Sequence, residues 1–171
     1  MKIEDFINRL DQTTNDILET TKNCSLEMLN FKRENSWSVL EILEHIYLTD
    51  KVIFTIISKP TTELSSTNEI IGNKNLKVIM IDQRTQRKII SPEILKPKGE
   101  IKDLNTFEKV FLTQRETLKD DLKTGKLLID NRIHKHPFMN DMTISDWLNF
   151  TIYHTQRHTE QIKDNLNRIE L

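Results

Sequence analysis

Long amphipathic stretches with few interruptions are the feature that most constrains this chain. Apolar residues recur at three- and four-residue intervals from about residue 2 to 22, which places them on one face of an α-helix. Similar spacing returns near residues 38, 105 and 143. The 171 residues include three glycines and four prolines, too few for the many turns of a strand-rich fold. The sequence therefore predicts an all-α fold.

Two of the expected helices have marked starts. Ser38 is followed three positions later by Glu41, the pattern of a reciprocal capping box, and this helix should end near Lys59. Thr143 and Asp146 repeat the pattern with a shorter acidic side chain, and the helix that they open should reach almost to the last residue. The capping pairs fix where both helices begin.

Four long helices and one long connection define the expected architecture. Residues 60–105 form a crossover with a short helix near Asn75 to Ile89. We expect this crossover to return the chain so that helices two and four run parallel. The length suits one core, so we expect a single domain over residues 1–171, an up-down-down-up four-helix bundle. Its long helices are predicted at about 2–22, 38–59, 105–124 and 143–171.

Charge and cysteine content exclude several partners. The chain has 25 basic and 26 acidic residues, and this balance gives no positive field to attract nucleic acid. The start is acidic and no apolar run approaches a membrane span, so we expect a cytoplasmic protein without a membrane partner. Cys24, the single cysteine, has no partner for an internal disulfide and no nearby histidine, which makes it a poor nucleophile candidate.

Three histidines are the strongest functional signal. His154 and His158 are four residues apart, about one helical turn, and share a helix face with Trp147. His45 lies at the edge of the apolar face of the second long helix, from which it can reach inward, whereas Glu44 should point away. Three imidazoles can bind a divalent metal and leave one coordination position open. We expect zinc or nickel, although iron and copper also accept imidazole ligands.

A simpler interpretation stands beside the metal site, and two further histidines are not expected to take part in it. A buried histidine is more often a hydrogen-bonded core residue than a ligand, and spacing alone does not separate the two cases. His134 and His136 lie in an expected loop beside a lysine and a proline, so we expect both to face solvent rather than to bind metal.

Four polar residues are candidates for a catalytic or supporting role. Glu41 lies one turn before His45, but its capping role competes with a place in the site. Asp50 falls within the apolar face, where a carboxylate needs a cation or an imidazole N–H. Gln161 follows His158 by three residues and could hydrogen-bond a ligand or substrate, and Arg157 could attract an anionic group. The alternative for both residues is a solvated surface position.

Several segments together resemble the signature of the DinB/YfiT-like superfamily, which includes the bacillithiol transferase-like proteins. The similarity covers nearly the whole chain and is loosest over residues 60–90. It rests on WSVLEILEH at 37–45, HTQRHTEQI at 154–162, HPF at 136–138 leading into TISDWL at 143–148, and LKPKG at 95–99.

The resemblance implies an up-down-down-up bundle, often a homodimer, with a divalent metal held by His45, His154 and His158. It also implies a small-molecule substrate and transfer of a low-molecular-weight thiol, such as bacillithiol or glutathione, to a small electrophile. A metal with three neutral ligands lowers the pKa of bound water to about 7 or captures a thiolate, so hydrolysis of a small molecule is an alternative. A non-catalytic, metal-binding stress-response bundle is a second alternative.

Overall fold

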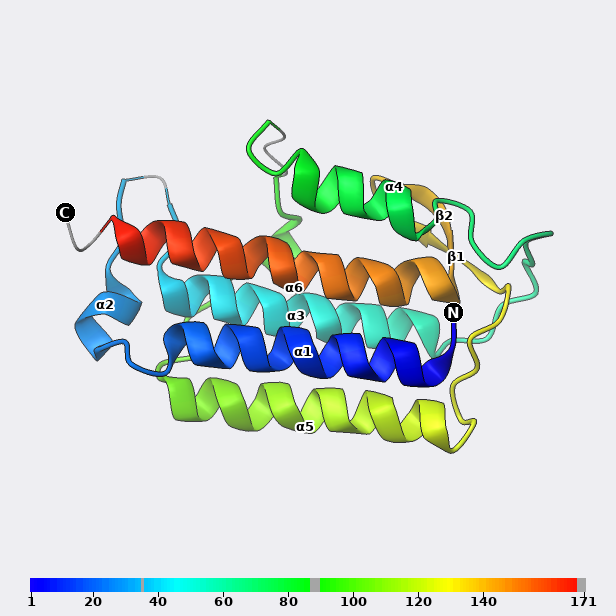
Figure 1. Cartoon of the computed structure of the whole chain (residues 1–171), viewed down its shortest axis with the longest axis horizontal. Helices are drawn as coiled ribbons and strands as arrows, with labels where there is room; N and C mark the ends of the chain where they lie inside the picture. Colours follow the sequence, from blue (N-terminus) through cyan, green and yellow to red (C-terminus); the bar gives the residue numbers. More distant parts are fainter. Residues whose placement is uncertain (35, 87–89, 169–171) are drawn as a thin grey trace.

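The protein is predominantly helical, as expected. The computed structural model describes residues 1–34, 36–86 and 90–168. Four long helices lie side by side in Figure 1, and the predicted starts and ends agree with theirs to within a few residues. The predicted extension of the last helix beyond residue 168 falls outside the described residues. The long helices are α1 (Ile3–Thr21), α3 (Val39–Ile57), α5 (Leu104–Lys123) and α6 (Ile144–Asn167).

Shorter elements occupy the connections. The helix expected near Asn75 to Ile89 is present as a short α-helix that continues into a π-helix, and residues 87–89 lie outside the described part. No described helix is long and apolar enough to cross a membrane. The shorter elements are α2 (Leu26–Asn30), α4 (Asn73–Lys77), the π-helix η1 (Val78–Asp82), the 3₁₀-helix η2 (Glu93–Leu95), and the strands β1 (Ile133–His136) and β2 (Asn140–Thr143).

Among the long helices, α1 and α3 each pack against both α5 and α6. Both predicted capping boxes form. The Ser38 hydroxyl accepts from the Glu41 N–H at 3.3 Å while the Glu41 carboxylate accepts from the Ser38 N–H at 2.8 Å. Thr143 and Asp146 form the second box at the start of α6. These local bonds fix where α3 and α6 begin.

The interior has an apolar cluster toward each end and a polar layer between them. Along each long helix, apolar positions give way to buried polar ones and then return; α5, for example, buries Phe111, Arg115 and Leu118 in succession. The two apolar clusters contain different residues of the same four helices. The polar layer consists of Thr13 and Thr14 of α1, Asp50 of α3, Arg115 of α5 and Thr155 of α6.

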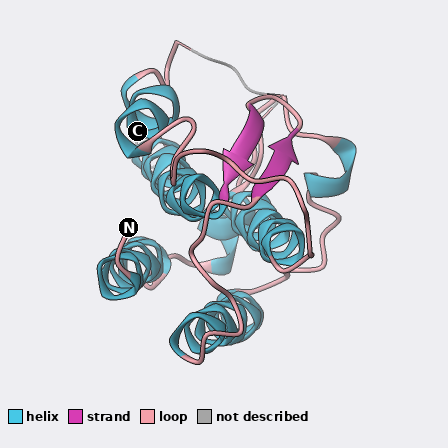
Figure 2. Cartoon of the chain, turned by 90° about the vertical axis from the view of Figure 1, so that its right-hand side faces the viewer, coloured by secondary structure: helices cyan, strands magenta, loops and turns pink. Residues whose placement is uncertain are grey.

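A β-hairpin corrects the expectation of a purely helical chain with a loop at residues 133–137. β1 and β2 pair antiparallel, with Ile133 opposite Thr143 and His136 opposite Asn140. Asn140 has a φ of 61°, a left-handed conformation that asparagine tolerates better than most residues. Figure 2 shows the hairpin beside the ends of the long helices, and the indole N–H of Trp147 donates to the His134 carbonyl at 3.2 Å.

Two buried carboxylates fasten the crossover to the long helices. Asp146 accepts from the N–H groups of Ile70 and Gly72 at 2.8 and 2.9 Å. Glu44 accepts from those of Lys98 and Gly99 at 2.7 and 3.0 Å. An ionised carboxylate that accepts several backbone N–H groups forms strong, charge-assisted hydrogen bonds. Glu44 is nevertheless buried, because the crossover covers that side of α3.

Candidate metal centre

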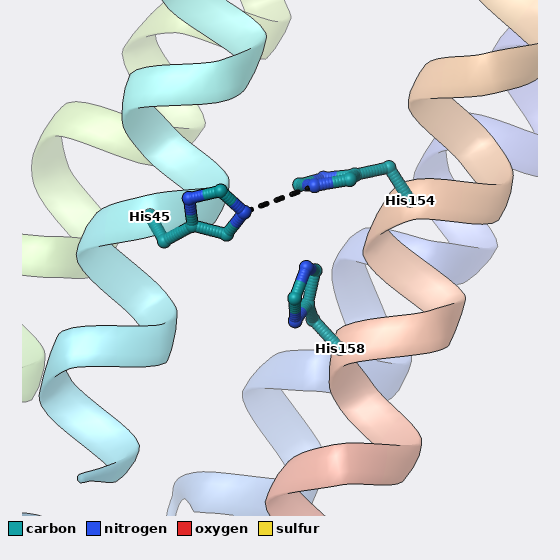
Figure 3. Close-up of side chains that lie close together, drawn as sticks. All are labelled: His45, His154 and His158. Atoms are coloured by element: carbon teal, nitrogen blue, oxygen red, sulfur yellow. Dashed lines mark hydrogen bonds between the residues drawn. The ribbon is translucent and has the colours of Figure 1, made fainter. Parts of the chain in front are cut away.

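The three predicted histidines meet between α3 and α6. His45 comes from α3, and His154 and His158 come from successive turns of α6. The two helices pack directly against each other, and the side chains face one another across the contact (Figure 3). The three residues retain only 5%, 6% and 9% of their accessible surface, respectively. The structure therefore joins His45 to a pair of histidines that lies 109 or more positions later in the chain, and the cluster is nearly buried.

The rings are close enough to share one ion. The Nε2 atoms of His45 and His154 are 3.2 Å apart, and one ligand atom from each of the three histidines lies within 4.8 Å of the others. At a zinc–nitrogen distance of about 2.0–2.1 Å, two ligands of a tetrahedral ion lie about 3.3 Å apart. The His45–His154 pair already has this spacing. The cluster fits a divalent cation once the third imidazole closes on the same point.

Hydrogen bonds outside the cluster orient two of the rings. His45 Nδ1 lies 2.8 Å from the carbonyl oxygen of Leu95, and His158 Nδ1 lies 2.8 Å from Oε1 of Gln161. Both oxygens accept, so Nδ1 carries the proton in each ring and Nε2 keeps its lone pair. His154 differs, because its Nδ1 is buried and has no hydrogen-bond partner among the described residues. Neutral rings with a fixed Nδ1–H are the form in which histidines bind metal through Nε2.

Burial keeps the imidazoles uncharged. Removal from water lowers the pKa of His158 to about 3, and it lowers the pKa of His45 below its usual value, against the hydrogen bond to Leu95. The pKa of His154 is well below the usual value, first through burial and then through the neighbouring His158 and His45. Protons therefore compete weakly for the ring nitrogens at neutral pH, which favours a metal cation.

Aromatic side chains enclose the cluster. Trp37 lies 4.9 Å from His45 between ring centroids, and Phe150 stacks on His154 at 5.6 Å with an angle of 22° between the ring planes. Such walls limit solvent around the imidazoles and strengthen electrostatic interactions within the cluster. The sequence did not single out Trp37 or Phe150 for this role, because both fit the apolar pattern of a core.

The four other candidates occupy different places. Gln161 hydrogen-bonds His158, a candidate ligand, and this was one of the two roles considered for it. Glu41 caps α3 and pairs with Lys32 at 2.7 Å. Arg157 donates to main-chain carbonyl oxygens of the crossover rather than pointing into the imidazole cluster.

Asp50 has the cationic partner that its position demanded. The pair lies in the polar layer, where Arg115 Nη2 is 3.0 Å from the Asp50 carboxylate. Asp50 retains none of its accessible surface and Arg115 retains 1%. Sequence reasoning required a cation for Asp50 but could not name one 65 positions away.

The two hairpin histidines lie outside the cluster, and neither faces solvent fully. His136 packs against Trp147 and Phe150, with ring centroids 5.1 and 5.0 Å away, and its Nδ1 accepts from the Phe138 N–H at 3.1 Å. Burial lowers its pKa to about 4. His134 is half-buried in the same strand. Both expectations of a solvated loop were wrong, because the hairpin folds back over the start of α6.

The fold and the cluster together define a helical protein with a candidate three-histidine metal centre. The chain belongs to the DinB superfamily, whose pattern matches residues 9–162 and so includes all three histidines. It is also similar to the uncharacterized protein YuaE of Bacillus subtilis (strain 168), with 26% identity over 150 residues, 87% of this chain and 90% of that protein. No solved structure matches the chain. The resemblance inferred from the signature segments is confirmed.

Proposed function

We propose that this protein is a divalent-metal-dependent enzyme that transfers a low-molecular-weight thiol, such as bacillithiol or glutathione, to a small electrophile. The observation that carries the proposal is the cluster of three imidazoles between α3 and α6, with one ligand atom of each within 4.8 Å of the others. Zinc or nickel suits this ligand set. With three neutral ligands, the bound metal would retain its positive charge and supply Lewis acidity toward a thiol.

The chain's own residues would prepare the site. Leu95 and Gln161 orient two of the imidazoles, and burial keeps the ligand nitrogens free of protons. Trp37 and Phe150 would exclude bulk water and flank a small substrate with aromatic surface.

Two alternatives rest on the same cluster. A metal-dependent hydrolase of a small molecule would use the same ligands with water in place of the thiol. A non-catalytic, metal-binding stress-response bundle is favoured by one observation, the small exposed fraction of the three histidines, which is at most 9%. The catalytic proposals require that a substrate reach the open position, whereas the structural proposal does not.

The first experiment is elemental analysis of protein purified without a histidine tag or added metal. We expect about one equivalent of divalent metal per chain, lost in His158→Ala and retained in His134→Ala, a matched control because His134 lies outside the cluster. Absence of metal from the wild type, and no uptake on titration with zinc or nickel, would refute the metalloenzyme.

Activity is then tested by supplying the metal-loaded protein with bacillithiol or glutathione and an aryl halide. We expect loss of free thiol, formation of a thioether and release of halide and a proton in equal amounts, all abolished by His158→Ala. Hydrolysis of an ester substrate without any thiol transfer would favour the hydrolase. If the metal is bound but exchanges no ligand with added thiol, the structural role is the correct one.

The remaining parts of the proposal concern topology and setting. We propose the up-down-down-up bundle: by the colours of Figure 1, α1 and α6 run in one direction while α3 and α5 run in the other. We also propose a homodimer in the cytoplasm. Light scattering gives the oligomeric state, and cell fractionation gives the location.

A further inference from the structure

The crossover touches α3 beside the metal centre through an exposed segment, residues 91–101. Within it, Ile101 is buried, whereas most of its other side chains are exposed. Its backbone–backbone hydrogen bonds among the described residues are local ones within η2, from Leu95 to Pro92 and from Lys96 to Glu93. The segment therefore depends on α3 for its position.

Two adjacent side chains of α3 provide the polar contacts to this segment. Glu44, with 1% of its surface exposed, accepts from the N–H groups of Lys98, Gly99 and Glu100 at 2.7, 3.0 and 3.1 Å. One residue further along, His45 donates from Nδ1 to the Leu95 carbonyl. The same short stretch of crossover is thus bound at one end by a carboxylate and at the other by a candidate ligand.

The contact with Leu95 decides which nitrogen of His45 faces the cluster. A neutral imidazole carries one proton, and a carbonyl oxygen near Nδ1 holds the proton there and leaves the Nε2 lone pair for the metal. Without that acceptor, the Nε2–H form becomes accessible, and it cannot bind a metal through Nε2. The Leu95 carbonyl belongs to a segment with few other attachments. A contact that holds this segment in place therefore also fixes the orientation of the His45 ring.

We propose that Glu44 is a positioning residue for the metal centre, because it holds residues 98–100 and thereby keeps the Leu95 carbonyl on His45 Nδ1. Glu44 touches neither the metal position nor a substrate. The effect on metal affinity rests on the proposed function, whereas the effect on the His45 proton concerns the metal-free protein and stands separately.

The fold supplies a matched control in Asp146. This carboxylate is also fully buried, and it holds the other end of the crossover through the N–H groups of residues 70–72. It also accepts from Thr143 in the capping box of α6. Asp146→Asn therefore removes at least as many hydrogen bonds as Glu44→Gln, but none of them leads to His45.

The first test is nitrogen-15 NMR of the histidine rings in metal-free protein. We expect a protonated Nδ1 on His45 in the wild type and in Asp146→Asn, and a mixture of both ring forms, with faster exchange of the ring proton, in Glu44→Gln. An unchanged Nδ1–H signal in a folded Glu44→Gln protein would overturn the proposal. The result does not depend on whether the protein binds metal, so it separates this inference from the proposed function.

The second test is the zinc dissociation constant, measured by competition with a chromophoric chelator. Loss of an indirect partner of a ligand typically costs 10- to 100-fold in metal affinity, so we expect at least a tenfold weakening in Glu44→Gln. Asp146→Asn should stay within about twofold of the wild type, because its hydrogen bonds do not orient a ligand. Equal weakening in both variants would show a general loss of stability and would overturn the proposal.

A milder pair of variants covers the case in which Glu44→Gln does not fold. Gly99 has a φ of 77° at the turn held by Glu44, and Gly125 has a φ of 73° after α5. A Cβ at either position meets nothing within 4 Å, so alanine strains the backbone without a collision. Gly99→Ala should weaken zinc binding several-fold and Gly125→Ala should not. Equal zinc affinity in the two variants would contradict the link between this turn and His45.

Discussion

Replacement of Asp50 by asparagine tests the polar layer at the middle of the helices. In the native protein, Nε and Nη2 of Arg115 donate to one oxygen of Asp50 at 3.1 and 3.0 Å, and Arg115 retains 1% of its accessible surface. Asparagine keeps an acceptor at about the same place but removes the counter-charge. Arginine does not lose its proton in proteins, so Asp50→Asn leaves an uncompensated buried cation.

The magnitude follows from that imbalance. Removing one partner of a buried ion pair costs about 3–5 kcal/mol, and the retained oxygen of asparagine places Asp50→Asn near the lower value. A domain of this size is stable by about 5–15 kcal/mol, so the loss is a large share of the total. With a urea dependence of about 1–3 kcal/mol per molar, the unfolding midpoint should fall by about 1–3 M.

A double replacement separates the charge effect from simple loss of packing. The hydroxyls that Arg115 contacts keep their own acceptors: Thr13 and Thr14 donate to the Leu10 carbonyl, and Thr155 donates to that of Thr151. Replacing Asp50 with leucine and Arg115 with methionine therefore leaves none of these hydroxyls without an acceptor. We expect the double variant to recover most of the lost stability.

The assay is urea unfolding followed by circular dichroism at a pH of about 8, where Asp50 is ionised although burial raises its pKa to about 6. A loss below about 1 kcal/mol in Asp50→Asn would refute the reasoning. The reasoning would also be refuted if the double variant were no more stable than Asp50→Asn, because the polar layer would then stabilise the fold through packing rather than charge.

Three further predictions concern the pH dependence of stability, the capping of α3 and the hydrogen bond between Gln161 and His158. Burial lowers the pKa of His136 to about 4, below the value of about 6.5 in an unfolded chain, so the unfolded state binds more protons between these two pH values. The free energy of unfolding should therefore fall as the pH drops from about 6.5 to about 4. His136→Phe should make this pH dependence less steep, as measured by urea unfolding. Ser38→Ala should destabilise the protein by about 1 kcal/mol, measured by thermal unfolding, because one side of the capping box is lost; no change would mean that Glu41 alone caps α3. Gln161→Ala should weaken zinc binding by about tenfold with little change in stability, whereas unaltered affinity would show that His158 needs no acceptor.

The long helices were predictable because their signals are local. Apolar spacing and the Ser38 and Thr143 capping patterns depend on residues within one turn, and the structure places both boxes where the sequence did. The spacing of His154 and His158 is local as well. The contact of His45 with them could be predicted only from the periodicity of its own helix and the family resemblance, because sequence spacing does not predict a contact between residues 109 positions apart.

The features that sequence reasoning missed depend on distant contacts or on unusual backbone. From the sequence alone, Arg115 is expected to be an exposed residue of an amphipathic helix. In the structure, it hydrogen-bonds four side chains from three other helices. The hairpin is short and polar, and the residue with a positive φ that follows its turn is Asn140 rather than a glycine. Glu44 lies on the side of α3 away from the histidines, and only the path of the crossover shows that this side is covered.

The two carboxylates that fasten the crossover have a consequence for how the length of this chain can vary. Asp146 fixes residues 70–72 and Glu44 fixes residues 98–101, so the ends of the intervening stretch are held independently of its length. The entropy of closing a loop rises only slowly as residues are added. Leu76 and Met80 of α4 and η1 are buried in the core, so insertions and deletions among DinB relatives should collect between Gln83 and Glu93, while the spacing from Leu95 to Gly99 stays constant.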